Sequence, residues 1–136
     1  MKILVDTNVL LDVLFNRQQF VKESLTVCKM CESNLIEGNI CAISIPNIIY
    51  IMRKELSKEK TADLINKLML IYNVVDLKAD DFAEAIKLDF EDYEDALQCV
   101  TAQKIKANFI VTRNVKDYIN SNIRAITPSE FIKLLN

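Results

Sequence analysis

The sequence lacks histidine and tryptophan altogether, and it holds only one glycine and two prolines in 136 residues. Without histidine the chain cannot build a Ser-His-Asp or Cys-His catalytic group, and zinc sites that use imidazole are excluded too. One glycine is too few for a glycine-rich loop that wraps phosphates. Any chemistry must therefore use carboxylates, amides, hydroxyls or thiols.

Long apolar runs are also missing, because no stretch approaches the about 20 residues needed to cross a bilayer. The N-terminal apolar run reaches a carboxylate already at Asp6, too early for the apolar segment of a signal peptide. We therefore expect a cytoplasmic protein without a membrane segment. Hydrophobic residues make up 51% of the chain and charged residues 26%, the balance of a single globular domain over residues 1–136.

The four cysteines do not indicate a disulfide framework. Cys28 and Cys31 form a C-x-x-C pair, a spacing used in metal sites and in redox sites. A structural zinc site needs a second such pair, and a redox pair is expected just after a strand, whereas this pair lies within a segment of helical periodicity. We interpret Cys28, Cys31, Cys41 and Cys99 as reduced, apolar parts of the interior.

The charges are distributed unevenly. The net charge of −2 argues against a large, uniformly basic surface for nucleic acid. Eight acidic residues and one lysine lie between positions 80 and 95, whereas the rest of the chain has more basic than acidic residues. A solvated helix face is the ordinary explanation for such a run, and an acidic binding site on a mildly basic body is the alternative.

The order of the expected elements predicts an α/β protein. Short apolar runs alternate with segments whose apolar residues recur at helical spacing. Strands separated by helices cannot pair as hairpins, so we expect right-handed crossovers and a three-layer α/β/α fold around a parallel sheet of about five short strands. The expected strands are 3–5, 40–43, 73–76, 109–112 and 124–126, and the expected helices are 20–36, 44–56, 57–72, 80–87, 91–106 and 128–135.

Three residues predict where helices begin or end. Ser44, followed by Pro46, is a plausible N-cap of the helix after the second strand, and Thr127 is one for the last helix. Gly38, the only glycine, is expected to end the helix that begins at residue 20. Apolar residues in excess at 48–52 and 68–71 would be consistent with a homodimer.

Polar side chains are expected to gather at one edge of the sheet. In open α/β sheets, ligands bind beyond the carboxyl ends of the parallel strands, near the point where the strand order reverses. Asp92 and Asp95 are three residues apart on a helix and therefore share a face, while Glu94 is expected to face elsewhere. The residues at this edge are Asp6, Ser44, Asn47, Asp92, Asp95, Thr112, Asn114 and Asp117.

Several carboxylates at one edge predict a hard divalent cation. Held together they repel one another unless a cation neutralises them, so Asp6, Asp92 and Asp95 are predicted to bind Mg²⁺ or Mn²⁺. Such an ion can activate a water molecule for attack on a phosphodiester. The alternative is that Asp6 only caps a helix and Asp92 only places charge at a helix start.

Four blocks of the sequence resemble the PIN-domain nucleases. They are LVDTNVLLD at 4–12, AISIPNIIYI at 42–51, EDALQ at 94–98 and IVTRNVKDY at 110–118, in the family's order and across nearly the whole chain. The resemblance implies a PIN-like fold and a metal-dependent ribonuclease. In it Asp6 is the first metal ligand, Asp95 is the later acidic ligand, and the loop 112–117 completes the site.

The resemblance also implies partners. Many small members of the family are the toxins of bacterial toxin–antitoxin pairs of the VapC type. They cleave structured RNA such as transfer RNA, form homodimers in many cases, and are held inactive by a small antitoxin protein.

Two positions depart from the family's pattern. Asn47 stands where the family usually has a glutamate, and Asn114 stands where many members have an aspartate. An amide oxygen can still contact a metal or its water, and Asp92 is close enough in the helix to replace the missing carboxylate. The sequence therefore leaves open an active ribonuclease and an impaired PIN-fold module that binds RNA or a protein.

A third alternative is a phospho-acceptor signalling domain. It requires a lysine after a late strand, where this chain has Thr127 and Pro128. For the nuclease, the predicted catalytic residues are Asp6, Asp92, Asp95, Asn114 and Asp117, and the predicted substrate contacts are Asn8, Ser44, Asn47, Thr112, Arg113 and Lys116.

Overall fold

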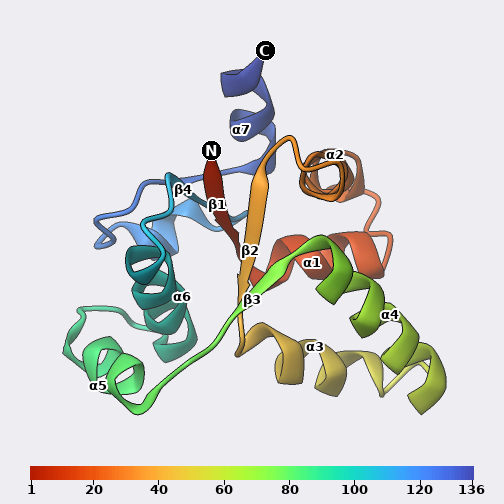
Figure 1. The fold of residues 1–136 in the computed structure, drawn as a ribbon, viewed down its shortest axis with the longest axis horizontal. Coiled ribbons are helices and arrows are strands. Elements are labelled where there is room, and N and C mark those ends of the chain that lie inside the picture. Colours follow the sequence, from red (N-terminus) through yellow and green to blue (C-terminus); the bar gives the residue numbers. More distant parts are fainter.

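Five parallel strands form the centre of the computed structural model, which describes residues 1–136 (Figure 1). The strand order is β3-β2-β1-β4-β5, with β1 in the middle. The strands are β1 (Lys2–Val5), β2 (Glu37–Cys41), β3 (Asn73–Val75), β4 (Phe109–Val111) and β5 (Ala125–Ile126). All four neighbouring pairs are parallel, which confirms the predicted sheet and the α/β class.

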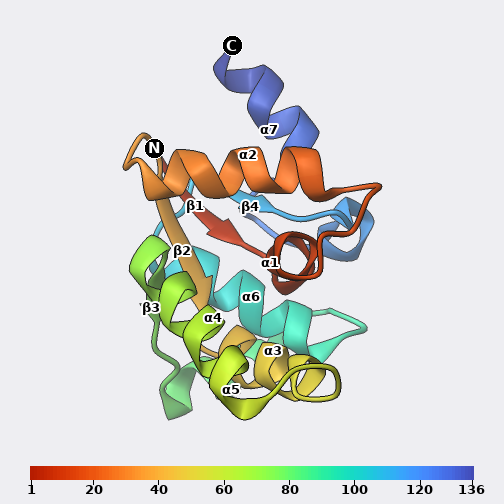
Figure 2. The same cartoon turned by 90° about the vertical axis from the view of Figure 1, so that its right-hand side faces the viewer.

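Helices cover both faces of this sheet, as Figures 1 and 2 show from two sides. One layer contains α1 (Thr7–Leu14), α2 (Val21–Glu32), α3 (Ser44–Met52), α4 (Lys58–Ile71) and α7 (Pro128–Leu135). The other contains α5 (Ala79–Lys87) and α6 (Tyr93–Lys104), and a short 3-10 helix, η1 (Val115–Tyr118), follows β4. None of the helices is both long and apolar enough to cross a membrane.

The central strand β1 is buried on both faces. Ile3 and Val5 belong to the larger core under α1, α2, α4 and α7, whereas Leu4 points to the opposite face. There it packs with Ala102 of α6 and Ile110 of β4. Successive side chains of a strand alternate between the two faces, so a strand covered on both sides needs an unbroken apolar run.

The structure corrects the role expected of Gly38. The helix α2 ends at Glu32, and Gly38 lies within β2 rather than at a helix end. The residue with a left-handed backbone in this turn is Asn34, whose φ is 62°. A Cβ atom on Gly38 would lie 2.5 Å from Sγ of Cys31 and 2.9 Å from Cδ1 of Tyr72. Glycine is therefore needed here because α2 packs directly against the strand.

The two predicted N-caps have different outcomes. The Thr127 hydroxyl accepts the backbone N–H of Glu130 at 3.1 Å, so Thr127 caps α7 as predicted. Ser44 is instead the first residue of α3, and its side chain is buried.

All four cysteines are free thiols in the structure. Cys31, Cys41 and Cys99 are buried, while Cys28 is half-buried. Burial raises the pKa of Cys31 to about 12, so this thiol stays protonated at neutral pH.

Candidate active site

The site lies where the strand order reverses, at the carboxyl end of β1. From β1 the chain proceeds to β2 and β3 on one side, whereas β4 and β5 lie on the other. Asp6 follows β1 directly and is the N-cap of α1, and the segment after β4 comes beside it. Asp6 therefore occupies the position at which parallel sheets bind ligands.

The carboxylate of Asp6 is buried and held by three donors. Its Oδ1 accepts the backbone N–H of Thr7 at 2.7 Å, and its Oδ2 accepts the hydroxyls of Thr112 at 2.8 Å and Tyr118 at 3.1 Å. Burial raises the pKa of Asp6, and these hydrogen bonds act in the opposite direction. The capping role that the sequence offered as an alternative is real, and it fixes this carboxylate in one orientation.

Asp95 in the first turn of α6 lies on the other side of the Tyr118 hydroxyl, which is 3.3 Å from its Oδ1. The pKa of Asp95 is raised to about 7, chiefly by burial and also by the negative charges of Asp6, Asp92 and Asp117, while the Tyr118 hydroxyl acts in the opposite direction. Asp92 caps α6 by accepting the backbone N–H of Asp95 at 3.0 Å. The acidic residues of the first turn of α6 thus converge on Asp6.

Glu94 lies at the site, although the sequence predicted that it faces elsewhere. Glu94 is half-buried, and Oγ1 of Thr7 lies 3.4 Å from its Oε1. Burial raises the pKa of Glu94; a hydrogen bond from Asn47 opposes this, and the charges of Asp6 and Asp92 add to it. Gln98 lies four residues further on the same helix face and is fully buried, which shows that this face points inward; the sequence alone does not reveal it.

These carboxylates share one pocket of about 460 Å³. No lysine or arginine is among its lining residues, so nothing on its walls compensates the negative charge. A second depression of about 660 Å³ adjoins it at Asp92 and Asp95, and Lys116 and Asp117 line that one. The first pocket is lined by Asp6, Thr7, Asn8, Leu11, Asn47, Tyr50, Ile51, Asp92, Glu94, Asp95 and Asn114.

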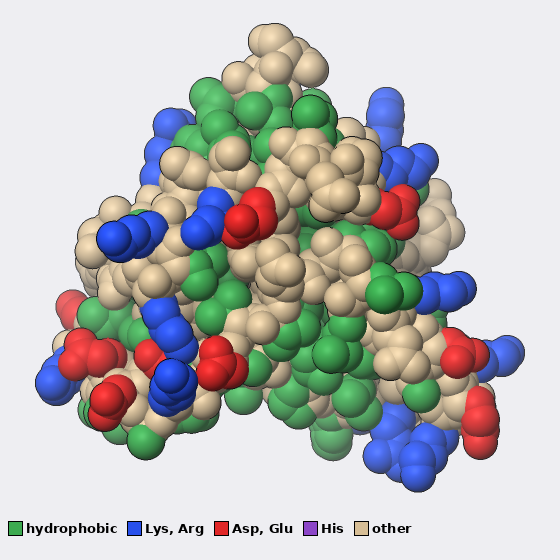
Figure 3. All heavy atoms as spheres, in the orientation of Figure 1, with side chains coloured by type: hydrophobic (Ala, Val, Ile, Leu, Met, Phe, Trp, Pro, Cys, Tyr) green, Lys and Arg blue, Asp and Glu red, His purple; other side chains and the backbone are tan.

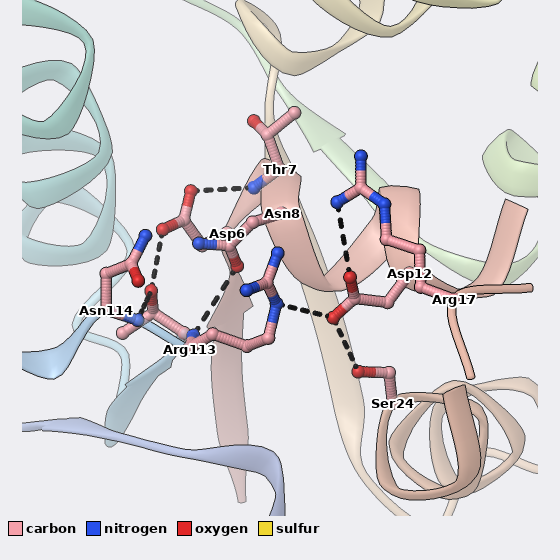
Figure 4. Close-up of polar contacts among 9 residues, drawn as sticks. Asp6, Thr7, Asn8, Asp12, Arg17, Ser24, Arg113 and Asn114 are labelled. Carbon is pink, nitrogen blue, oxygen red and sulfur yellow. Dashed lines mark hydrogen bonds and ion pairs between the residues drawn. The ribbon is translucent and has the colours of Figure 1, made fainter. Parts of the chain in front are cut away.

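Four predicted substrate contacts do not line this pocket: Lys116 lines the adjoining depression, and Ser44, Thr112 and Arg113 line neither. Ser44 and Thr112 have no exposed surface, and their hydroxyls contact other side chains. Arg113 turns away from Asp6 and donates from Nε to the buried Asp12 at 2.7 Å (Figure 4). Ser44, Thr112 and Arg113 support the walls of the site and do not face its opening.

The surface around the site carries charges of both signs. Figure 3 shows acidic side chains over α5 and the start of α6. Basic side chains gather near the turn between α3 and α4 in the same view, and the exposed basic residues of that segment are Arg53, Lys54, Lys58 and Lys60. The acidic segment at 80–95 is therefore partly a solvated surface and partly the wall of the pocket.

The donor atoms suit a hard cation, although they are not gathered around one point. Carboxylate oxygens without a neighbouring cation are the ligands that Mg²⁺ and Mn²⁺ prefer. No group of three acidic or cysteine side chains is close enough in this structure to hold one ion. Asp92 is exposed and Glu94 and Asp95 are half-buried, so an ion from solvent can reach their carboxylates.

Comparison with known proteins assigns the family. The family model described as PIN domain matches residues 2–116. The chain belongs to the PIN domain family. Over 140 aligned residues this PIN domain is 26% identical to Ribonuclease VapC1 of Aquifex aeolicus, covering 99% of this chain and 96% of that protein. The match favours the two nuclease-like alternatives over a phospho-acceptor domain.

Solved structures share the fold of this PIN domain. One is VapBC2 from Rickettsia felis bound to a DNA fragment from its promoter, with a TM-score of 0.74 and 16% identity over 93% of this chain and 98% of that one. Another is DNA-bound VapBC from Salmonella typhimurium, with a TM-score of 0.73 and 17% identity over 94% and 98%. At this identity the likeness establishes the fold alone.

Proposed function

We propose that this PIN domain is a metal-dependent endoribonuclease and the toxin of a toxin–antitoxin pair. The observation that carries the proposal is the convergence of Asp6 and Asp95 in a pocket that has no compensating cation. The relative named Ribonuclease VapC1 and the neighbours named VapBC support the same activity and an antitoxin partner. The substrate class is RNA, with structured RNA such as transfer RNA to be tested first.

Asp6, Asp92 and Asp95 are the side chains that would hold Mg²⁺ or Mn²⁺. When bound, such an ion polarises a phosphate oxygen and lowers the pKa of a water molecule, which histidine-free chemistry requires. Asp6 contributes a carboxylate whose orientation is fixed by Thr112 and Tyr118. Asp92 and Asp95 line the same pocket and would contribute the other carboxylate oxygens.

The other polar residues are assigned to substrate. Asn8, Asn47 and Asn114 line the pocket and offer amide groups to phosphate and sugar oxygens. Lys116 is exposed beside Asp117 in the adjoining depression, where its charge attracts the RNA backbone. Asp117 adds negative charge near Asp95 and is proposed to orient a water molecule.

Assembly is also proposed. Of the apolar residues that favoured a homodimer, Ile48, Met52 and Leu68 are buried in the chain's own core. Met69 and Leu70 remain exposed, at 50% and 86%, and are available to a second copy or to an antitoxin. The proposed location is the cytoplasm, where RNA and an antitoxin would both be met.

The test is Mn²⁺ and Mg²⁺ titration by calorimetry on the wild type and on Asp6→Asn with Asp95→Asn. The double variant should lose binding, while the exposed-surface control Glu84→Gln should keep it. Cleavage of a panel of structured RNAs should then depend on the ion, stop with a chelator, and be absent in Asp6→Asn. A folded wild type that binds neither ion contradicts the proposal.

One observation supports a second candidate, an impaired PIN domain that binds RNA or protein without cutting. The pocket carries amides at Asn47 and Asn114, and no three acids are gathered around one point. This candidate predicts metal-independent RNA binding and no cleavage under any divalent ion. A gel-shift assay beside the cleavage assay separates the two.

A further inference from the structure

We propose that Glu94 is a further carboxylate that binds the divalent ion at this site, held in place by the buried side chains of Thr7, Ser44 and Gln98. The inference rests on the proposed function, because it names a further residue for the same ion. It starts from the face of α6 whose side chains reach Thr7 and Ser44, the first residues of α1 and α3. Glu94 and Gln98 share that face, four residues apart, and Glu94 reaches the pocket.

Three helices meet at a small buried polar group. Nε2 of Gln98 lies 3.3 Å from Oγ1 of Thr7 and 3.2 Å from Oγ of Ser44, and the two hydroxyl oxygens are 2.7 Å apart. Gln98 and Ser44 have no exposed surface, and Thr7 has 7%. The first residues of α1 and α3 are thus joined to the middle of α6 away from water.

The hydrogen-bond directions in this group lead to Glu94. The Gln98 amide has two protons and donates to both hydroxyls. The Ser44 hydroxyl then donates to Oγ1 of Thr7, which leaves the Thr7 proton for Oε1 of Glu94 at 3.4 Å. In this arrangement every proton has an acceptor, and the last donor stabilises the charged form of Glu94.

Burying these polar side chains in the core costs free energy of folding, which indicates that they do more than fill space. Buried amides and hydroxyls cost free energy unless all their hydrogen bonds are made. Oε1 of Gln98 is the one buried side-chain oxygen or nitrogen in the structure without a partner. A leucine would occupy a similar volume without that cost, so the amide is explained by the hydroxyls it orients.

Glu94 also supplies the charge that α3 does not. On the α3 side of the pocket Asn47 carries no charge, although its amide lowers the pKa of Glu94. The carboxylate of Glu94, anchored by Thr7, brings negative charge to that side and faces Asp6. With Glu94 the pocket has a fourth carboxylate beside those of Asp6, Asp92 and Asp95.

The experiment measures Mn²⁺ binding by calorimetry at pH 8, together with thermal unfolding in a chelator. Glu94→Gln keeps the shape and removes the charge, and it should bind Mn²⁺ at least about tenfold more weakly while its melting temperature does not fall. Glu84→Gln, an exposed position on α5, is the matched control and should bind as the wild type does. Wild-type affinity in Glu94→Gln overturns the proposal.

A second variant moves the negative charge from position 94 to position 47. In Asn47→Glu with Glu94→Gln the carboxylate comes from α3 and the amide from α6, so affinity should recover toward the wild-type value. A folded double variant that binds no better than Glu94→Gln counts against the proposal. Gln98→Leu should fold at least as stably as the wild type. It should bind Mn²⁺ about threefold or more weakly, since only the orientation of Thr7 is lost. Unchanged affinity in this variant counts against the role of Gln98, Ser44 and Thr7 in orienting Glu94.

Failure of this inference differs from failure of the proposed function. Asp6→Asn is titrated in the same series. Loss of binding in Asp6→Asn with full binding in Glu94→Gln overturns only the role of Glu94. A wild type that binds no ion overturns the proposed function instead.

Discussion

Arg113 donates from its Nε to Oδ2 of Asp12 across 2.7 Å, and this ion pair joins the segment after β4 to helix α1 (Figure 4). Asp12 has no exposed surface, and its Oδ1 accepts a hydrogen bond from Nη1 of Arg17 at 3.3 Å. The Arg113 guanidinium lies over the ring of Phe20, 4.0 Å from its centre. The pair therefore holds the residues that precede Asn114 against the helix that Asp6 caps.

Removal of Asp12 should destabilise the fold strongly. Asp12→Ala leaves two arginines without their buried counter-ion, and we expect the free energy of unfolding to fall by about 3 kcal/mol in urea denaturation. Glu84→Ala, which breaks the exposed pair with Lys87, should change it by less than about 0.5 kcal/mol. Similar changes in the two variants would show that the Asp12 network contributes little.

The pKa of Asp95 predicts how stability depends on pH when no metal is bound. The value is raised to about 7 in the folded protein, against about 3.9 in an unfolded chain. Between these values the folded protein keeps a proton that the unfolded chain has released, so stability should fall as the pH rises from about 4 to about 7. The raised pKa values of Asp6 and Glu94 act in the same direction.

Asp95→Asn should flatten this dependence. At pH 8 in a chelator the variant should be more stable than the wild type by about 1 to 2 kcal/mol, a figure reduced for solvent screening because Asp95 is only partly buried. Near pH 4 the difference should vanish. Thermal unfolding between pH 4 and 8 measures this, with the exposed Asp63→Asn on α4 as control; equal slopes in wild type and Asp95→Asn would exclude the assignment.

Tyr118→Phe should weaken metal binding mainly at low pH. The hydroxyl lowers the pKa values of both Asp6 and Asp95, whereas the ring packs edge to face on Phe90 and stays in place. Without the hydroxyl both carboxylates hold their protons to higher pH, so Mn²⁺ affinity should drop several-fold at pH 6 and little at pH 8. Tyr93→Phe, whose hydroxyl meets the backbone of Phe82, is the control. An equal loss at both pH values would point to a structural defect.

Gly38→Ala should be costly although the backbone there is ordinary for a strand. The added methyl group would overlap Cys31 and Tyr72, and neither can move freely in the core. We expect the free energy of unfolding to fall by about 1 to 3 kcal/mol. The double variant with Cys31→Ala removes one of the two clashes and should recover part of the loss; no recovery would show that the packing against α2 is not the cause.

Much of the fold follows from local patterns. The apolar runs at 3–5 and 109–111 predicted buried parallel strands because helices separate them in the chain, whereas β2, expected at 40–43, spans Glu37–Cys41. The helix limits were less predictable. Gly38 was interpreted as the end of α2, since the sequence does not show that Cys31 and Tyr72 press against that position from other elements.

The sequence by itself determined the order of the elements, the parallel sheet and the edge at which Asp6 and Asp95 lie. These follow from short unbroken apolar runs, from the helical periodicity of 3.6 residues and from the rule that parallel strands end at a common edge. Only the tertiary structure decided that Glu94 enters the pocket and that Arg113 leaves it for Asp12. The physical reason is that spacing tells which residues share a helix face, whereas the packing of α6 on the sheet decides what that face meets.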